Sequence, residues 1–396
     1  MIVLCADRLF TPREEILDPL LFIEDGFISA IASRAEREIP KNATVIDLTG
    51  NFKDAILAPG FVDIHMHGGA GLDVMRTSMA DLPRLNKFLT THGVTGYFPT
   101  TVAAPLGDTC SALERMADAI EHAPTTRHEG GDVQACPLGI HLEGPFLSHK
   151  RRGVHPPENL LEPTLQVFER LWQAARGHVR MMTIAPELPG AIEVIAEAAC
   201  RGVCVSIGHS DAVMATAQAA VKAGARHATH TFNAMRPLDH REPGILGEAL
   251  TSQQLTADII ADGIHVAPEI VKLFLRAKGL DRAVLITDAT AAAGMPDGIY
   301  QLGPIEVEVK NGRCTVHGET GDKLAGSVLT MDRAVRNVTQ FADWSLRDAV
   351  RAATLNPATA AGLKRHGQIA PGAEANFVVL SPSGEVRKTI VRGIVS

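Results

Sequence analysis

Two histidines lie two residues apart, His65 and His67, at the end of the apolar run PGFVDIHMHGG. Residues i and i+2 of a strand point to the same face, so the two imidazoles are expected side by side. Later apolar runs end in further acid or imidazole groups: Glu143, His209, His230, His265 and Asp288. Any one such histidine is more often a hydrogen-bonded core residue than a ligand. Together these groups would be costly to desolvate without a shared cation, so they predict a divalent metal site.

Alternating strands and helices are needed to bring these residues together. Eight apolar runs qualify as strands: 61–69, 94–102, 138–146, 179–187, 203–211, 227–235, 255–266 and 283–290. Helical segments separate several of them; residues 210–225 carry apolar residues at helical spacing and open with Ser210 and Asp211, which favour a helix cap. This order predicts an α/β fold of the (β/α)8, TIM-like barrel type, whose C-terminal mouth collects the polar strand ends.

Both ends of the chain have a different pattern, with short apolar runs between Gly and Pro turns. Neither end has enough strands for a stable sheet, so we expect one small β-sandwich domain built from both. The expected division is residues 1–58 for its N-terminal part, 59–355 for the barrel and 356–396 for the segment that completes it. Residues 305–316 are predicted to insert a hairpin that turns at Asn311 and Gly312.

Composition excludes several classes of protein. The net charge of −7 over 396 residues and the pI of about 6.1 argue against a nucleic-acid or membrane-surface partner attracted by bulk charge. The six cysteines include no CxxC pair, and neither a signal peptide nor a membrane-spanning run is apparent. We therefore expect a cytoplasmic protein with reduced thiols.

The ordered motifs resemble the amidohydrolase superfamily and, within it, the family of N-acetylglucosamine-6-phosphate deacetylases. The matching stretches are PGFVDIHMHGG, GIHLEGPF, KRRGVH, SIGHSDA, THTFNAM, REPG, DGIHV, TDAT and LAGSVLTM. The resemblance implies metal-dependent hydrolysis of the acetamide of N-acetylglucosamine 6-phosphate to glucosamine 6-phosphate and acetate. It also implies that Glu143, His209 and His230 hold one metal, and that His65 and His67 hold a second bridged by Glu143. Zinc is the first choice, with iron or another divalent ion compatible, at one or two ions per subunit.

The resemblance also implies roles around the metal. Asp288 would act as general base and then as general acid, and His265 would stabilise the oxyanion while contacting substrate. Sugar and phosphate contacts are expected from Val154, His155, Asn233, Ala234, Arg241, Leu324, Ala325 and Gly326. The basic run Lys150, Arg151 and Arg152 is more often typical of a solvated face, and it is left out of the site. A homodimer is expected, with Arg241 reaching the neighbouring site.

Three other functions remain open at this stage. N-acetylgalactosamine 6-phosphate differs from the expected substrate at one hydroxyl. Another amidohydrolase, acting on a cyclic amide or an aminated purine, would share the fold but have no use for the phosphate donors His155 and Arg241. A non-catalytic scaffold could lose metal ligands without penalty, yet every expected ligand is present.

Overall fold

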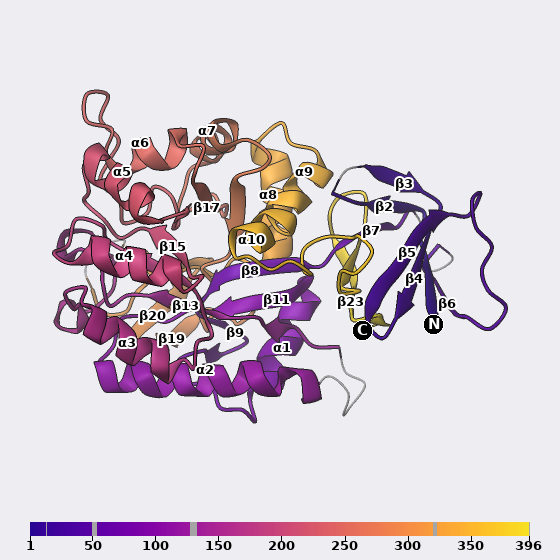
Figure 1. Cartoon of the computed structure of the whole chain (residues 1–396), viewed down its shortest axis with the longest axis horizontal. Coiled ribbons are helices and arrows are strands. Elements are labelled where there is room, and N and C mark those ends of the chain that lie inside the picture. Colours follow the sequence, from indigo (N-terminus) through magenta and orange to yellow (C-terminus); the bar gives the residue numbers. More distant parts are fainter. Residues whose placement is uncertain (13, 50–53, 127–132, 320–322, 396) are drawn as a thin grey trace.

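The computed structural model describes residues 1–12, 14–49, 54–126, 133–319 and 323–395. Figure 1 shows a large helical and sheet unit beside a smaller all-strand unit that contains both chain ends. Within the described residues, no helix is long and apolar enough to cross a bilayer.

All eight runs expected as barrel strands are strands in the structure. They are β8 Phe61–Met66, β11 Val94–Pro99, β13 Ile140–Glu143, β14 Val179–Ile184, β15 Cys204–Ile207, β16 His227–Ala228, β17 Thr256–Ile260 and β18 Ala283–Ile286. They are mostly buried and rich in Val, Ile and Leu, as expected of parallel strands covered on both faces.

The strands close into a ring. β8 and β11 pair in parallel, Thr100 bridges in parallel to His141 of β13, and β13 to β18 form one parallel sheet in chain order. Between the last and first strands, the Asp288 amide donates to the His65 carbonyl at 2.9 Å. The predicted (β/α)8 barrel is therefore confirmed.

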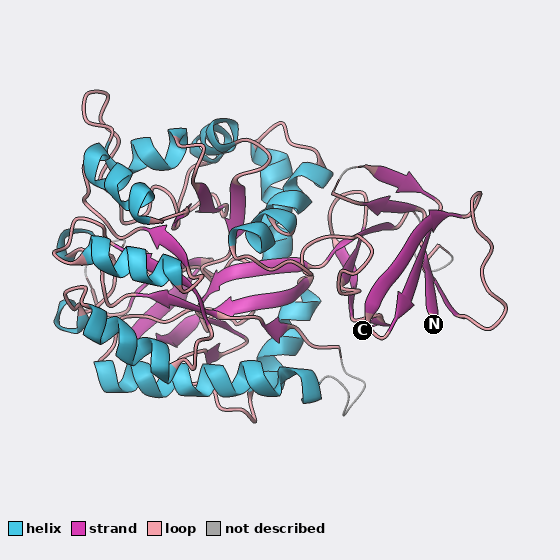
Figure 2. Cartoon of the chain, in the orientation of Figure 1, coloured by secondary structure: helices cyan, strands magenta, loops and turns pink. Residues whose placement is uncertain are grey.

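A helix follows each barrel strand and packs around the outside of the barrel (Figure 2). These helices are α1 Leu82–Thr91, α2 Leu106–Thr126, α3 Leu165–Ala174, α4 Ala191–Cys200, α5 Met214–Ala223, α6 Gly244–Thr251, α7 Pro268–Lys278 and α8 Met331–Phe341. Shorter elements are α9 Leu346–Ala352, α10 Leu355–Ala360, the 3-10 helices η1 His149–Arg151 and η2 Pro157–Asn159, and strands β9 Gly68–Gly69, β10 Leu72–Asp73 and β12 Cys136–Pro137.

The predicted cap of α5 is wrong. The helix begins at Met214, its N-cap position is Val213, whose side chain makes no capping hydrogen bond, and the Met214 amide donates to Glu242 Oε1 at 2.9 Å. Ser210 Oγ donates instead to Glu187, and the Asp211 carboxylate accepts from Lys150 and Arg151. Ser210 and Asp211 therefore bind residues at the barrel mouth that are distant in the sequence, and their side chains are not available to cap the helix.

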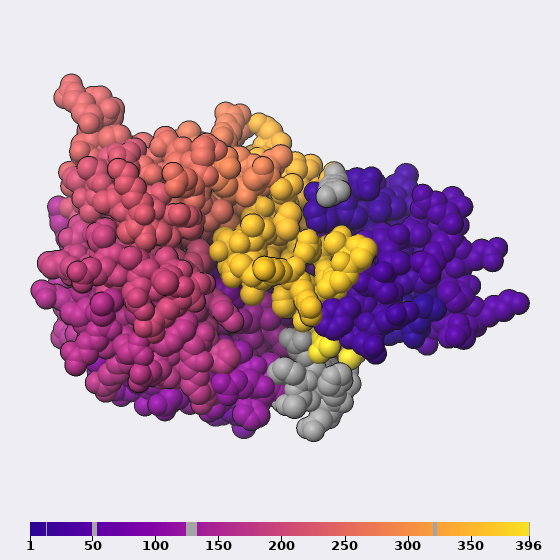
Figure 3. All heavy atoms as spheres, viewed as in Figure 1, coloured from indigo at the N-terminus to yellow at the C-terminus, as the bar shows by residue number. Residues whose placement is uncertain are grey.

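The small unit is a β-sandwich formed by both ends of the chain, as predicted. One sheet contains β1 Ile2–Cys5, β4 Pro19–Glu24, β5 Phe27–Ser33 and β6 Thr44–Asp47; the other contains β2 Arg8–Phe10, β3 Glu15–Leu17, β7 Ile56–Pro59, β22 Phe377–Leu380, β23 Val386–Val391 and β24 Ile394–Val395. The ends join where β22 pairs antiparallel with β7, and Leu21 and Phe377 bury in a core shared by both sheets. Figure 3 shows C-terminal residues seated between the barrel and the N-terminal strands. The division into 1–58, 59–355 and 356–396 stays a prediction.

An insertion follows the eighth barrel strand. The predicted hairpin is present as β20 Ile305–Lys310 and β21 Arg313–Val316, and its turn residues Asn311 and Gly312 have φ of 52° and 75°. Positive φ at both positions fits the tight turn that Asn-Gly favours. A third strand, β19 Gly298–Leu302, pairs with β20 and was not predicted.

Candidate active site

The carboxyl ends of the barrel strands surround a cavity of about 140 Å³. Its lining residues are His67, Val102, Glu143, Gly153, Val154, His155, His209, His230, Asn233, Ala234, His265, Asp288, Leu302, Leu324 and Gly326. Most residues predicted for the site therefore lie together at one mouth. Three predicted residues do not line it: His65 and Ala325 are fully buried, and Arg241 is exposed on a loop.

Glu143 lies at the centre of one group of metal-ligand atoms. Its Oε1 atom is 3.2 Å from His209 Nε2 and 3.0 Å from His230 Nε2, and the two imidazole nitrogens are 3.0 Å apart. Donor atoms around a tetrahedral zinc with bonds of about 2.0–2.1 Å lie about 3.3 Å apart. These three donors thus have nearly the spacing of ligands to a single ion.

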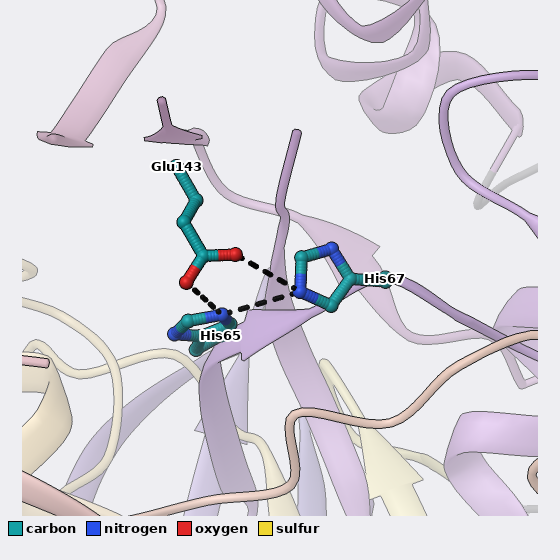
Figure 4. Close-up of side chains that lie close together, drawn as sticks. All are labelled: His65, His67 and Glu143. Atoms are coloured by element: carbon teal, nitrogen blue, oxygen red, sulfur yellow. Dashed lines mark hydrogen bonds and ion pairs between the residues drawn. The ribbon is translucent and has the colours of Figure 1, made fainter. Parts of the chain in front are cut away.

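The HxH pair forms a second group with the same carboxylate (Figure 4). His65 Nε2 and His67 Nε2 are 3.3 Å apart, and they lie 3.5 Å and 3.3 Å from the two oxygens of Glu143. His65 lies on β8, His67 directly follows that strand and Glu143 ends β13, and the three side chains point toward one another. The two oxygens of Glu143 therefore face both groups of donors, and the bridging of two ions by Glu143 stays a prediction.

Two of the imidazoles are oriented by backbone carbonyls on their far side. His67 Nδ1 is 3.1 Å from the Thr100 carbonyl, and His209 Nδ1 is 2.9 Å from the Arg151 carbonyl. Such a contact places the proton on Nδ1 and leaves Nε2 free for a metal. The Nδ1 atoms of His65 and His230 are buried without a hydrogen-bond partner among the described residues.

Charge within the metal-free chain is balanced by protonated imidazoles. Burial opposes a charged ring, but hydrogen bonds to Asp288 and Glu143 outweigh it and raise the pKa of His67 to about 10. His230 follows the same pattern, because Glu143 raises its pKa to about 9 despite burial, whereas burial lowers the pKa of His209 to about 4. A divalent ion that binds here must displace these protons, so its uptake depends on pH.

Asp288 lies against the HxH pair. Its Oδ1 atom is 3.1 Å from His67 Nε2 and 3.6 Å from His65 Nε2. Burial raises the pKa of this carboxyl, but the His67 hydrogen bond and the charges of both histidines hold it at about 2. The carboxylate is therefore ionised at neutral pH and able to accept a proton.

The backbone is strained where these residues lie. His209, His230 and Asp288 have φ of 46°, 28° and 49°, in a region that non-glycine residues rarely adopt. Ala234 has a φ of 49° in the same mouth. Strain of this kind costs on the order of 1–3 kcal/mol per residue and clusters at functional sites.

Two further histidines at the cavity differ in which nitrogen can donate. His155 Nδ1 accepts the Ala103 amide at 3.1 Å, so Nε2 carries the proton of the neutral ring. His265 Nδ1 is 2.7 Å from the Asp262 carboxylate, so Nε2 donates only when the ring is doubly protonated. His155 Nε2 lies 3.6 Å from Glu143 Oε2.

Further residues, not predicted from the sequence, support the site. Asp262 accepts both the His265 amide and its ring nitrogen, and the DGIH spacing of an Asx-turn could have indicated it. Thr101 Oγ1 accepts the Glu143 amide at 3.0 Å, and Asp258 accepts the His230 amide. Val102 and Leu302 line the cavity as apolar residues, for which single-sequence patterns offer no signal.

The predicted substrate loops lie at the rim. The Ala325 amide donates to the Cys314 carbonyl at 3.0 Å, which fixes Leu324 and Gly326 over the end of β18. Lys150 and Arg151 pair with Asp211, and Arg152 donates to the His155 carbonyl. Lys150 is solvated, with a side chain 68% exposed, whereas Arg151 and Arg152 are partly buried, and none of the three lines the cavity.

The sequence model of the Amidohydrolase family matches residues 56–395. The chain belongs to this family. This amidohydrolase is 36% identical to an N-acetylglucosamine-6-phosphate deacetylase of Bacillus subtilis (strain 168), over 97% of this chain and 94% of the relative. It is 37% identical to an N-acetylgalactosamine-6-phosphate deacetylase of Escherichia coli O157:H7, over 99% and 98% of the two chains.

Solved structures show the same likeness. A variant of the Mycobacterium smegmatis N-acetyl-D-glucosamine-6-phosphate deacetylase, in complex with N-acetyl-D-glucosamine-6-phosphate, superimposes with a TM-score of 0.89 at 35% identity, covering 100% of this amidohydrolase and 98% of that chain. An enamidase at 16% identity, with a TM-score of 0.62 over 100% and 95% of the two chains, shares the fold alone.

Proposed function

We propose that the protein is a metal-dependent deacetylase that hydrolyses the acetamide of N-acetylglucosamine 6-phosphate to glucosamine 6-phosphate and acetate. The observation that carries this proposal is the convergence of Glu143, Asp288 and the imidazoles of His67, His209 and His230 on one cavity, with His65 buried beside them. Relatives that act on this class of phosphorylated amino sugar, aligned over nearly the whole chain, support the choice of substrate.

Asp288 and the cavity histidines divide the proton chemistry. A bound divalent ion supplies Lewis-acid activation of water and of the acetamide carbonyl. Asp288 accepts the proton of the attacking water and then delivers it to the departing amine, which cannot leave without it. His155 donates from its neutral ring toward the carbonyl oxygen, a role that the sequence had suggested for His265 alone. His265 donates there or to substrate when doubly protonated.

The phosphate and sugar are held by the rim. Asn233, the Ala234 amide and the segment Leu324, Ala325 and Gly326 are proposed as contacts, together with Val154; the one free ring N–H of His155 donates to the acetamide carbonyl rather than to the phosphate expected from the sequence. Arg241 suits phosphate through its bidentate fork, and it lies on an exposed loop that projects from the barrel (Figure 1). We propose a homodimer in which Arg241 completes the neighbouring site.

The metal is proposed to be zinc, with iron or another divalent ion compatible with the same imidazole and carboxylate donors. One or two ions per subunit fit the donors around Glu143, which are His65 and His67 on one side and His209 and His230 on the other. A cytoplasmic location agrees with the six cysteines, none of which forms a disulfide in the described part of the chain.

The second candidate substrate is N-acetylgalactosamine 6-phosphate, because a relative with that name is 37% identical to this chain, beside 36% for the glucosamine enzyme of Bacillus subtilis (strain 168). The deciding experiment measures acetate release from both N-acetyl sugars, each with and without the 6-phosphate. We expect turnover of N-acetylglucosamine 6-phosphate and loss of it without the phosphate. A higher kcat/KM for the galactosamine epimer would select the second candidate, and equal rates on unphosphorylated sugars would contradict both.

The double variant His65→Gln/His67→Asn is expected to lose one of two ions. These histidines supply two of the three donors of one group, whereas His209 and His230 remain close to Glu143 and to each other. Metal analysis of protein purified with excess zinc tests this. Loss of both ions, or of neither, would contradict the assignment of a second site.

Arg241→Ala is expected to lower kcat/KM for phosphorylated substrate by about 10–150-fold, since a charge-assisted contact contributes about 1.5–3 kcal/mol. Mixing it with Asp288→Asn under subunit exchange tests whether Arg241 acts across the dimer. In that case a mixed dimer holds one intact site, and activity recovers toward about a quarter of wild type for random exchange. If mixing restores nothing, Arg241 does not act across an interface.

A further inference from the structure

The Asp211 carboxylate joins loops from three barrel strands. It lies 2.6 Å from Lys150 Nζ and 2.8 Å from Arg151 Nε, both on the loop after β13. Arg236, on the loop after β16, donates to the Asp211 carbonyl at 3.4 Å. Asp211 itself follows β15, the strand that leads into His209.

The loop that Asp211 holds forms part of the active site. The Arg151 carbonyl on this loop accepts a hydrogen bond from His209 Nδ1, and the Ser148 amide donates to the His209 carbonyl at 3.0 Å. A Cβ at Gly153 would lie 3.1 Å from His209 Cε1, so the loop packs directly on the imidazole. Gly153, Val154 and His155 then line the cavity.

We propose that Asp211 is a positioning residue, which holds the loop of residues 148–155 so that the Arg151 carbonyl orients His209 and His155 faces the cavity. Its effect on catalysis rests on the proposed function. Its effect on loop order and on metal retention does not.

The anchoring of Asp211 separates this contact from an ordinary surface ion pair. Exposed pairs contribute about 0–1 kcal/mol, because both side chains must be fixed. The Asp211 side chain is only 13% exposed, and its amide donates to Glu187 Oε1 at 2.6 Å. The backbone of Asp211 is therefore held by Glu187 while its carboxylate contacts the loop.

The test compares Asp211→Asn with Asp211→Glu and with the control Asp118→Asn. Asp118 accepts from Arg176 at 2.6 Å on the outer helix α2, with a side chain 44% exposed. Protein loaded with zinc alone is mixed with a chelator, and the rate of zinc release is measured. Amide hydrogen exchange of residues 148–155 is measured in the metal-free protein.

Asp211→Asn is expected to release zinc about ten times faster, at the lower end of the 10–100-fold effect of supporting partners of metal ligands. Amide exchange of residues 148–155 should also accelerate. Asp211→Glu should partly restore both the zinc-release rate and the exchange rate, and Asp118→Asn should change neither.

Arg151→Met keeps the backbone carbonyl of residue 151 but removes one partner of Asp211, so it tests the same contact if Asp211→Asn does not fold. Unchanged zinc release in a folded variant overturns the proposal, whatever the exchange shows. If Asp211→Asn releases zinc faster but the wild-type protein produces no acetate, the proposed function is refuted and this inference stands.

Discussion

Asp288→Asn is expected to retain the fold and the metal but to lose about 10²–10⁴-fold in kcat, the range that a general acid–base group contributes. The amide of asparagine keeps the size of the side chain but can neither accept the proton of water nor deliver it to the amine. In the native chain, Asp288 Oδ1 lies 3.1 Å from His67 Nε2, so the carboxylate is next to the metal-ligand atoms.

The matched control is Asp297→Asn. Asp297 accepts the Asn311 amide at 2.9 Å in the exposed hairpin insertion, so its substitution should leave kcat unchanged. The measurement is steady-state acetate release with metal content determined on the same samples. A kcat for Asp288→Asn within a factor of about three of wild type would remove this residue from the proton transfer.

Glu143→Gln is expected to empty both metal positions and to abolish turnover. The carboxylate is within 3.0–3.5 Å of His65, His67, His209 and His230 through its two oxygens, so it is shared by both groups of donors. Glutamine keeps the shape but removes the negative charge that two divalent ions would share. The loss of affinity should exceed the roughly 10–100-fold cost of removing a supporting partner.

Metal analysis and thermal unfolding of Glu143→Gln test this prediction. The control is Glu162→Gln, because the Glu162 side chain is exposed in the segment that precedes α3. The control should bind metal as wild type does. If Glu143→Gln retains two tightly bound ions, Glu143 does not bridge them.

The sequence predicted the barrel because its strands are nearly continuous apolar runs, a signal that depends little on distant contacts. The same reasoning located Glu143, His209 and Asp288, since the carboxyl ends of parallel strands meet at one mouth. β19 escaped prediction because its residues are mostly half-exposed, so the alternation of apolar and polar residues is weak.

What the sequence could not predict depends on tertiary partners. Ser210 and Asp211 have the composition of a helix cap, but Glu187, Lys150 and Arg151 compete for them across the mouth. The tautomer of His155 is decided by the Ala103 amide, 52 residues away in the chain. Positive φ at His209 and Asp288 is imposed by the surrounding structure. It has no signature in the sequence, because neither residue is a glycine.

The most direct test of the account is acetate release from N-acetylglucosamine 6-phosphate by purified protein before and after removal of its metal. We expect chelation to stop acetate release and stoichiometric zinc or another divalent ion to restore it, with up to two ions bound per chain. Acetate release that is unchanged in protein shown to be free of metal would contradict the central claim that Glu143 and the surrounding histidines act through a divalent ion.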